Sequence, residues 1–477
     1  MNALLGSTVL LVTGLAACSS VSRAESMKQP PPEVRGTWMT TTANTALASP
    51  ENTAASMKKL RDIGLNTVYV ETWKNGYTQF PSPTLEKAIG VERRPDLMPG
   101  HANYPAYTPG MSGPRDLLEE TLIQAHRNQL IYIAWFEYGF MASYKDTNNE
   151  LRQQYPEWMT TTQDGSLVSD QNPFVWMNPL RPETRELLLG IVVDAVDKYD
   201  LDGVQLDDRI AWPVTMGYDD YTVEAYKKEH KGQAPPDDPR DKRWVAWRAK
   251  KVGEFAEQFY TELKQRRPNL IVSISPAIYP WSLDNYACDW KTWSHNGWMD
   301  EYVPQIYRNN FERVKKDWPA QMKAAGRDRQ GDLIAGLRVV GAGPDTAWPD
   351  LRQKMNLVRR GNAGGHCHWF SRGVLEVYPE QLMQYYDVAN DGQAKHPKLP
   401  TDWRPAPIRA TKGETGWAAE VVTPGRYRVI ARTGDVWREV VSQELSAGSP
   451  ALDIAALADA DAVELLVDRR GHEPLGH

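Results

Sequence analysis

The sequence predicts an α/β protein: a (β/α)8 TIM barrel followed by a small all-β, sandwich-like domain. Short runs rich in β-branched and aromatic residues alternate with helical stretches over most of the chain. Eight such runs precede residue 392, and the segments that follow them are much longer than the turns that precede them. Strands that alternate with helices pair in parallel, and eight such units favour closure into a barrel.

The predicted barrel domain covers residues 33–392. Its expected strands are 34–40, 67–71, 130–137, 203–208, 270–276, 302–308, 333–339 and 365–370. A doubly wound open sheet is the alternative, but no Gly-rich phosphate-binding loop follows the first strand.

The connections between strands and helices are of two kinds. Tight turns lead into strands, for example at 64–66, 128–129, 200–202, 268–269 and 361–362. Long irregular segments follow strands, at 72–113, 138–182, 209–240 and 277–296. In a (β/α)8 barrel the loops after the strands build the active-site face, so this asymmetry predicts where a site should lie.

The two ends of the chain differ from the barrel. Residues 393–408 are polar and Pro-rich and predict a linker, and 409–477 predict a small β-sandwich that acts as a spacer or packing module rather than a glycan-binding domain. Residues 1–18 resemble a lipoprotein signal peptide that ends in Leu-Ala-Ala-Cys, with Cys18 as the lipidated residue. An ordinary cleaved signal peptide is the alternative. Residues 19–32 predict a flexible tether, and the expected location is the outer membrane, facing the periplasm.

Composition narrows the class of partner. The formal net charge is −6 and no basic tract is present, which argues against nucleic acid and leaves the lipid anchor as the membrane contact. No His/Cys group has metal-ligand spacing, so we expect no metal and no cofactor. The 18 Trp and 21 Tyr against 8 Phe suit a partly wet binding surface. Neither the oligomeric state nor a bond between Cys288 and Cys367 follows from the sequence.

The fourth predicted strand carries the first candidates for chemistry. In Gly203-Val-Gln-Leu-Asp-Asp, alternation places Gln205 and Asp207 on the lumen face, with Asp208 at the start of the loop. Two adjacent carboxyls at a strand end suit acid, base or nucleophile work, because burial raises one pKa and leaves the other group ionised. The structural alternative is that one of these aspartates caps a helix N-terminus or holds the loop in place through hydrogen bonds. The sequence does not choose between Asp207 and Asp208.

Polar and aromatic residues recur at the other strand ends. Glu137 follows an apolar run and is the candidate general acid, whereas Glu71 is either a site residue or the ion-pair partner of Arg35 or Lys74. The inward face of the eighth strand is ambiguous between His366 with His368 and Trp369 with Arg372. The expected substrate-binding residues are Arg35, Trp38, Glu71, Trp73, Lys74, Trp135, Gln205, Tyr279, Gln305, Tyr307, His368 and Trp369.

Six sequence stretches together resemble the glycosyl-hydrolase-like 10 family: EVRGTWMTT, LRDIGLNTVYVETW, IAWFEYG, LDGVQLDDR, VSISPAIYP and YVPQIY. Its members include envelope lipoproteins that cut peptidoglycan strands stripped of their peptides. The resemblance implies site roles for Arg35, Trp135, Asp207, Asp208, Gln305 and Tyr307. The Gly-x-Gln-x-Asp core is also similar to an α-amylase-type motif, in which the residue at the position of Asp207 is the nucleophile. Many relatives carry Asn at the position of Glu137, Gln at that of Glu71 and Tyr at that of Arg209, which leaves open a different glycan preference.

The leading hypothesis is a glycoside hydrolase that cleaves O-glycosyl bonds of a cell-envelope glycan polymer with two carboxyl groups, either retaining or inverting. A non-catalytic glycan-binding lipoprotein is the first alternative, and it predicts that ion pairs occupy the rim carboxylates. A metal-dependent polysaccharide deacetylase is the second, and it would need more ligands than His366 and His368.

Overall fold

The computed structural model describes residues 30–107, 113–169, 172–341, 343–390, 392–414, 416–452 and 454–471. The signal-peptide prediction, Cys18 and tether residues 19–29 lie outside the described residues. In the described part of the chain, no helix is both long enough and apolar enough to cross a membrane.

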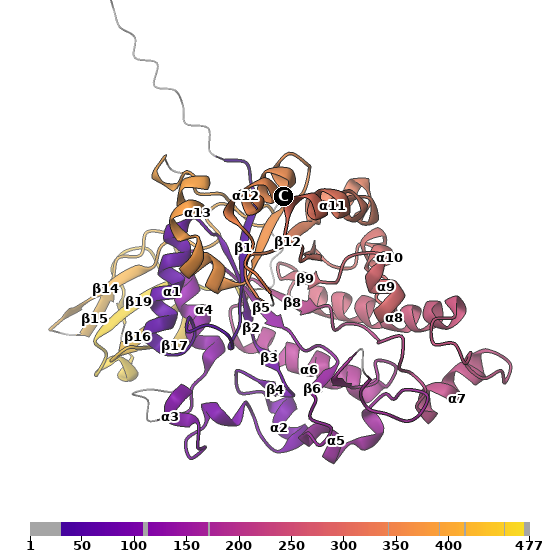
Figure 1. The fold of residues 1–477 in the computed structure, drawn as a ribbon. Coiled ribbons are helices and arrows are strands. Elements are labelled where there is room, and N and C mark those ends of the chain that lie inside the picture. The colour runs from indigo at the N-terminus through magenta and orange to yellow at the C-terminus, as the bar shows by residue number, and fades with distance from the viewer. Residues whose placement is uncertain are drawn as a thin grey trace, which may run out of the picture.

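A curled parallel sheet forms the centre of the larger domain (Figure 1). Its strands, in chain order, are β1 (Val34–Met39), β2 (Thr67–Glu71), β5 (Ile131–Phe136), β8 (Gly203–Asp207), β9 (Ile271–Ser275), β10 (Glu301–Tyr302), β11 (Gln305–Ile306), β12 (Ile334–Arg338) and β13 (Gly365–Trp369). The sheet order is β10-β9-β8-β5-β2-β1-β13-β12-β11, and every pairing in it is parallel.

The sixth strand of the barrel is divided into two short strands, β10 and β11, and it closes the barrel. β10 pairs with β9 and β11 pairs with β12, and a further parallel bridge joins Tyr302 to Leu333. Pro304 lies between the two pieces and has no N–H to donate to a neighbouring strand, so the predicted continuous strand 302–308 is interrupted there. The barrel therefore has eight strand positions, which confirms the predicted fold class.

One helix of the outer ring follows each strand position. These helices are α1 (Pro50–Ile63), α4 (Leu117–Arg127), α6 (Pro182–Lys198), α8 (Lys242–Arg266), α10 (Trp290–Asn296), α11 (Phe311–Ala325), α12 (Trp348–Arg359) and α13 (Pro379–Tyr385). Side chains cap several of them: Ser49 accepts from a first-turn amide of α1, and Asp116 does the same for α4. Gly64 ends α1 with a φ of 101°, a conformation that glycine adopts without strain.

The long loops after the strands contain their own short elements, at the end of the barrel where the strands terminate. These are β3 (Trp73–Lys74), β4 (Tyr77–Thr78), α2 (Pro83–Ile89), α3 (Tyr104–Tyr107), β6 (Met141–Tyr144), α5 (Glu150–Gln154), β7 (Phe174–Trp176), α7 (Asp220–Glu229) and α9 (Trp281–Tyr286). β3 pairs with β4 in the loop after β2, and β6 pairs with β7 in the loop after β5, and both pairings are antiparallel.

The C-terminal domain is a six-stranded antiparallel sheet in the order β17-β16-β19-β14-β15-β18. Its strands are β14 (Ile408–Gly413), β15 (Gly416–Ala419), β16 (Gly425–Thr433), β17 (Val436–Leu445), β18 (Ala451–Leu452) and β19 (Ala462–Val467). β14 pairs with β19 through its first residues and with β15 through its later ones, so the two halves of the sheet share one apolar core.

The opposite face of this sheet packs on α4 of the barrel (Figure 1). Ile123 of α4 lies in one buried cluster with Ile430, Trp437 and Leu466, and burial of each such side chain contributes roughly 2 kcal/mol. The guanidinium of Arg127 stacks 4.0 Å from the Trp437 ring centroid. The domain is therefore held directly against the barrel.

Residues 393–404 form an ordered strap across the end of the barrel where the strands begin. The Lys395 carbonyl accepts from the Glu33 amide at 3.0 Å, and the His396 ring lies 3.2 Å from the Glu301 carboxylate. Trp403 donates to Asp202 at 2.6 Å. The predicted linker is thus packed structure over much of its length, because its few large side chains fill the amino-terminal end of the barrel.

Candidate active site

Asp207 ends β8, and its side chain lies in the mouth of the barrel. Its Oδ1 accepts from Ser275 Oγ at 2.7 Å and from Gln305 Nε2 at 2.6 Å, and Arg209 pairs with Oδ2. These donors from two strands and a loop fix the orientation of a carboxyl that is only 1% exposed. Burial raises the pKa of Asp207 to about 8, although the charge of Arg209 acts in the opposite direction.

Asp208 and Glu137 complete a group of three carboxyls around Arg209. Arg209 pairs with Asp208 as well as with Asp207. The Asp208 side chain is 27% exposed and that of Glu137 is 13% exposed, so both reach the open mouth. Burial raises the pKa of Asp208, and the negative charge of Glu137 adds to that effect. Glu137 comes directly after β5, the neighbour of β8 in the sheet.

Lys74 joins this group to the buried Glu71. Its Nζ lies 2.8 Å from Glu71 Oε2 and 3.3 Å from Glu137 Oε2. Glu71 also accepts from the Thr41 amide at 3.2 Å and from the Thr41 hydroxyl. Burial raises the pKa of Glu71. Of the alternatives for Glu71, the ion pair with Lys74 is the one that forms.

The charges in this cluster are unequal. Four carboxyls meet two cations, because Lys74 contacts Glu71 and Glu137 whereas Arg209 contacts Asp207 and Asp208. Close carboxyls in a poorly solvated site repel each other, so the group retains a proton that isolated carboxyls would lose near neutral pH. A retained proton beside an ionised carboxylate is the pair of states that acid/base catalysis needs.

Aromatic rings line the lumen below the carboxyls. Trp38, Trp135, Tyr307 and Trp369 come from four different strand positions and meet with ring-centroid separations of 5.5–6.5 Å. Trp38 donates to Gln205 at 2.7 Å, so the buried Gln205 orients this ring. In the described part of the chain, the buried Nε1 of Trp135 has no hydrogen-bond partner. Trp38 and Trp135 are buried, whereas Tyr307 and Trp369 are partly exposed, so these two rings of the aromatic wall are the ones that suit the apolar face of a sugar ring.

Arg35 and His368 lie away from this mouth, which corrects the expectation that they reach the substrate. Arg35 is near the start of β1, where it pairs with Glu33 at 2.6 Å and donates to the Gly392 carbonyl at 2.5 Å. His368 faces the helices and contacts the Tyr386 hydroxyl at 3.0 Å. Trp369 therefore holds the inward position on β13, which resolves the ambiguity in that strand.

Trp73 and Tyr279 are also placed by packing. Trp73 is fully buried and donates to the Gly139 carbonyl at 3.1 Å, so it fastens one loop to the next. Gln321 of α11 binds the Tyr279 backbone, and the Tyr279 ring packs on Trp290 at 5.9 Å. Neither Trp73 nor Tyr279 is placed beside the carboxyls by these contacts.

Three residues of the cluster fell outside the predicted site. Arg209 is the first residue after the adjacent aspartates, and Thr41 lies in a loop, where no periodic pattern indicates the direction of a side chain. Ser275 shares the inward face with Ser273 by alternation, and this was the available signal for it.

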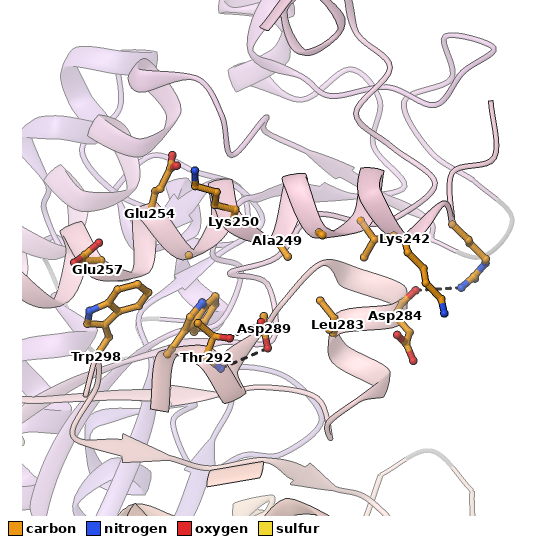
Figure 2. Close-up of a pocket in the computed structure, with 15 residues that line it drawn as sticks. Lys242, Ala249, Lys250, Glu254, Glu257, Leu283, Asp284, Asp289, Thr292 and Trp298 are labelled. Atoms are coloured by element: carbon orange, nitrogen blue, oxygen red, sulfur yellow. Dashed lines mark hydrogen bonds between the residues drawn. The ribbon is translucent and has the colours of Figure 1, made fainter. Parts of the chain in front are cut away.

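Several cavities lie near or beside this face of the barrel. One of about 440 Å³ adjoins the carboxyl cluster through Thr41 and Lys74. A larger groove of about 710 Å³ runs between α8 and α9–α10, away from the carboxyls, with Ala249, Leu283 and Trp298 among its lining residues (Figure 2).

Among the described residues, no group of three or more His, Cys, Asp or Glu side chains has the arrangement of a metal site. Cys288 and Cys367 are both buried free thiols.

Comparison with known proteins gives the family. The model of the family described as Glycosyl hydrolase-like 10 matches residues 33–328, well over half of the chain. The chain belongs to this family. The matched range contains Glu137, Asp207, Asp208 and Gln305, whereas β12 and β13, which complete the barrel, lie beyond it.

Relatives of this glycosyl-hydrolase-like chain have similar names. It is 24% identical to the glycosyl hydrolase DigH of Escherichia coli over 67% of this chain and 76% of the relative. It is 22% identical to the glycosyl hydrolase YngK of Bacillus subtilis, over 58% of this chain and 54% of that protein.

Two solved structures with a similar fold carry glycoside-hydrolase names. The glycoside hydrolase domain of PgaB (BpsB) from Bordetella bronchiseptica superimposes with a TM-score of 0.52 at 13% identity, over 76% of this chain and 99% of that one. An alpha-L-fucosidase from Paenibacillus thiaminolyticus gives 0.53 at 16% identity, over 75% and 49%. At such identities the similarity concerns the fold.

Proposed function

We propose that this protein hydrolyses O-glycosyl bonds in a cell-envelope glycan, either peptidoglycan strands or a related polysaccharide. The observation that carries the proposal is Asp207, a buried carboxyl oriented by Ser275, Gln305 and Arg209 at the end of a barrel strand. Membership in a glycosyl-hydrolase-like family supports the reaction class. The excess of carboxyls over cations supplies both a proton and an ionised group.

The two roles fall to different parts of the cluster. Asp207 makes fixed contacts to its donors, so it is the carboxylate that attacks the sugar or activates water. Glu137 reaches the mouth beside the aromatic wall and protonates the leaving oxygen. Arg209 pairs with both aspartates and limits their mutual repulsion. The retained proton moves to Glu137 when Asp207 ionises.

A second function deserves a test because one observation favours it. Every carboxyl of the cluster contacts a cation, as expected of a non-catalytic glycan-binding protein on the same barrel. In that case the carboxyls are structural, and their amide variants bind glycan as the wild type does.

The decisive experiment measures sugar release from purified denuded peptidoglycan. Wild type is compared with Asp207→Asn, Asp208→Asn and Glu137→Gln, each checked for folding by circular dichroism. We expect the wild type to release fragments and Asp207→Asn to lose at least about 10³-fold in rate. If wild type binds the glycan and releases nothing, the binding function replaces the enzymatic one.

We also propose that the chain is exported and anchored through a lipid on Cys18, with the barrel facing the periplasm. The Leu-Ala-Ala-Cys sequence supports this. Radiolabelled palmitate should enter the wild type and not Cys18→Ala. Labelling of neither protein would contradict the anchor.

A further inference from the structure

Two lines of aromatic rings lead away from the carboxyl cluster, through the loops that follow β5 and β9, the two neighbours of β8. The two loops touch where the Trp176 ring of β7 lies 6.1 Å from that of Tyr286. The first leaves through the loop after β5. Tyr138 directly follows Glu137, its ring lies 6.2 Å from that of Phe174, and the Phe174 ring lies 5.1 Å from that of Tyr144. Tyr138 is buried, whereas Tyr144 is 49% exposed. The line thus begins inside the mouth and ends in solvent.

The second line leaves through the loop after β9. The Trp212 amide, four residues after Asp208, donates to the Tyr286 carbonyl at 2.8 Å, which fastens this loop beside the cluster. The Tyr286 ring lies 5.4 Å from the ring of Trp281, and Trp281 is 47% exposed. Burial raises the pKa of Tyr286, and the charge of Asp208 adds to it, as expected of a ring next to the carboxyls.

The two exposed rings come from loops that follow different strands, one on each side of the catalytic strand in the sheet order. β5 and β9 are the two neighbours of β8 in the sheet, and β6 and α9 lie apart in Figure 1. Tyr144 and Trp281 are two of the few large apolar side chains that the described residues leave strongly exposed. What sets Tyr144 and Trp281 apart is that each ends a line of rings that starts beside the carboxyls, and a flat exposed ring of this kind stacks on the apolar face of a pyranose.

We propose that Tyr144 and Trp281 are outer sugar-binding platforms on either side of the bond that is cleaved, so that the protein binds the interior of a long glycan strand. This inference rests on the proposed function for its position, because the two lines meet at the carboxyls. A chain that spans both platforms is cut within its length, whereas a short fragment that fills only the centre of the site contacts neither.

The groove between α8 and α9–α10 is the competing path (Figure 2). Leu283 and Asp284 of α9 are among its lining residues, whereas Trp281 and Tyr286 of the same helix are not. Its wall carries Trp298, so Trp298→Phe reports on binding there with little change in packing.

The test measures the affinity of purified full-length protein for denuded peptidoglycan fragments of one, two and four disaccharide repeats, by isothermal titration calorimetry. We expect Tyr144→Ala and Trp281→Ala each to weaken binding of the four-repeat fragment by about tenfold and to leave the one-repeat fragment unchanged. Tyr144→Phe and Trp281→Phe keep a ring and should retain most of the affinity. Tyr221→Ala, which removes another exposed ring on α7, should bind every fragment as the wild type does.

The outcomes separate this inference from the proposed function. Cleavage by the wild type together with unchanged four-repeat affinity in both alanine variants overturns the platforms and leaves the hydrolase standing. Loss of affinity in Trp298→Phe alone also overturns them, because the strand then follows the groove. Length-dependent binding that needs both rings, without any cleavage, supports the platforms and refutes the hydrolase.

Discussion

Replacement of Asp207 by Asn should remove activity and at the same time stabilise the fold at neutral pH. The pKa of Asp207 is raised by burial from its ordinary value of 3.8 to about 8. The folded protein therefore holds this proton at pH 7, whereas the unfolded chain releases it. For each pH unit above the ordinary pKa, this difference lowers the stability of the wild type by about 1.4 kcal/mol, so the penalty at pH 7 is roughly 4 kcal/mol.

Asn needs no proton and avoids this penalty. The neutral Asp207 carboxyl also contacts Arg209, and Asn replaces this contact with a weaker one through its amide, while Arg209 keeps Asp208. A loss of about 1–3 kcal/mol for that contact leaves a net stabilisation of about 1–3 kcal/mol at pH 7. The sign follows from linkage: a raised carboxyl pKa makes the free energy of unfolding of the wild type fall as pH rises between about 4 and 8, so the advantage of Asn grows over that interval.

Urea denaturation at pH 5, 6, 7 and 8 measures this difference. Asp202→Asn is the matched control, because Asp202 directly precedes the same strand and has the opposite shift. Burial alone would raise its pKa, but Arg404 and His126 lower it below the ordinary value. Asp202→Asn should therefore destabilise by an amount that stays constant from pH 5 to 8. A difference for Asp207→Asn that is flat, or that shrinks as pH rises, would refute the argument.

Three further predictions follow from the same geometry. The kcat/KM of the wild type on denuded peptidoglycan should fall above about pH 8, where the cluster loses its retained proton. Arg209→Gln should move this fall in kcat/KM to higher pH, because a nearby cation lowers carboxyl pKa values. A fall that moves to lower pH contradicts this. Glu137→Gln should lose about 10²–10⁴-fold on natural glycan and much less on an aryl glycoside whose leaving group needs no proton, and equal losses on both would exclude the acid role. Gly36→Ala should lower stability by about 1–3 kcal/mol in thermal unfolding, because its Cβ would lie 2.8 Å from the Tyr69 ring in the lumen.

Periodicity predicted the barrel well because its strands are buried on both faces. The runs at 34–40 and 203–208 differ from β1 and β8 by a single residue at one end. Alternation then identified Asp207 and Gln205 as inward on the fourth strand. It could not orient the eighth strand, where the sequence Gly-His-Cys-His-Trp puts polar or aromatic side chains on both faces, and the bond from His368 to Tyr386 depends on a helix that folds back from later in the chain.

The ion pairs were less predictable than the strands, because their partners meet only once the sheet has formed. Lys74 and Glu137 are far apart in sequence and meet because β2 and β5 are neighbours in the sheet. Arg35 lies within a stretch that resembles family members, yet its position near the first residue of β1 puts it at the other end of the barrel. Its partner Gly392 is 357 residues away in sequence, at the C-terminal end of the barrel domain.

The strap 393–404 follows the barrel in sequence and contacts the start of its first strand. Arg35 in the first strand donates to the Gly392 carbonyl, across 357 residues of chain, and the Glu33 amide binds Lys395. Contacts of such large sequence separation form late, because the entropy of closing the intervening loop must be overcome first. The first strand therefore acquires its last hydrogen bonds when nearly the whole barrel has been synthesised. A nascent chain that lacks the strap presents an open barrel end with Glu301 and Asp202 uncovered, a form that chaperones and proteases can distinguish from the finished protein.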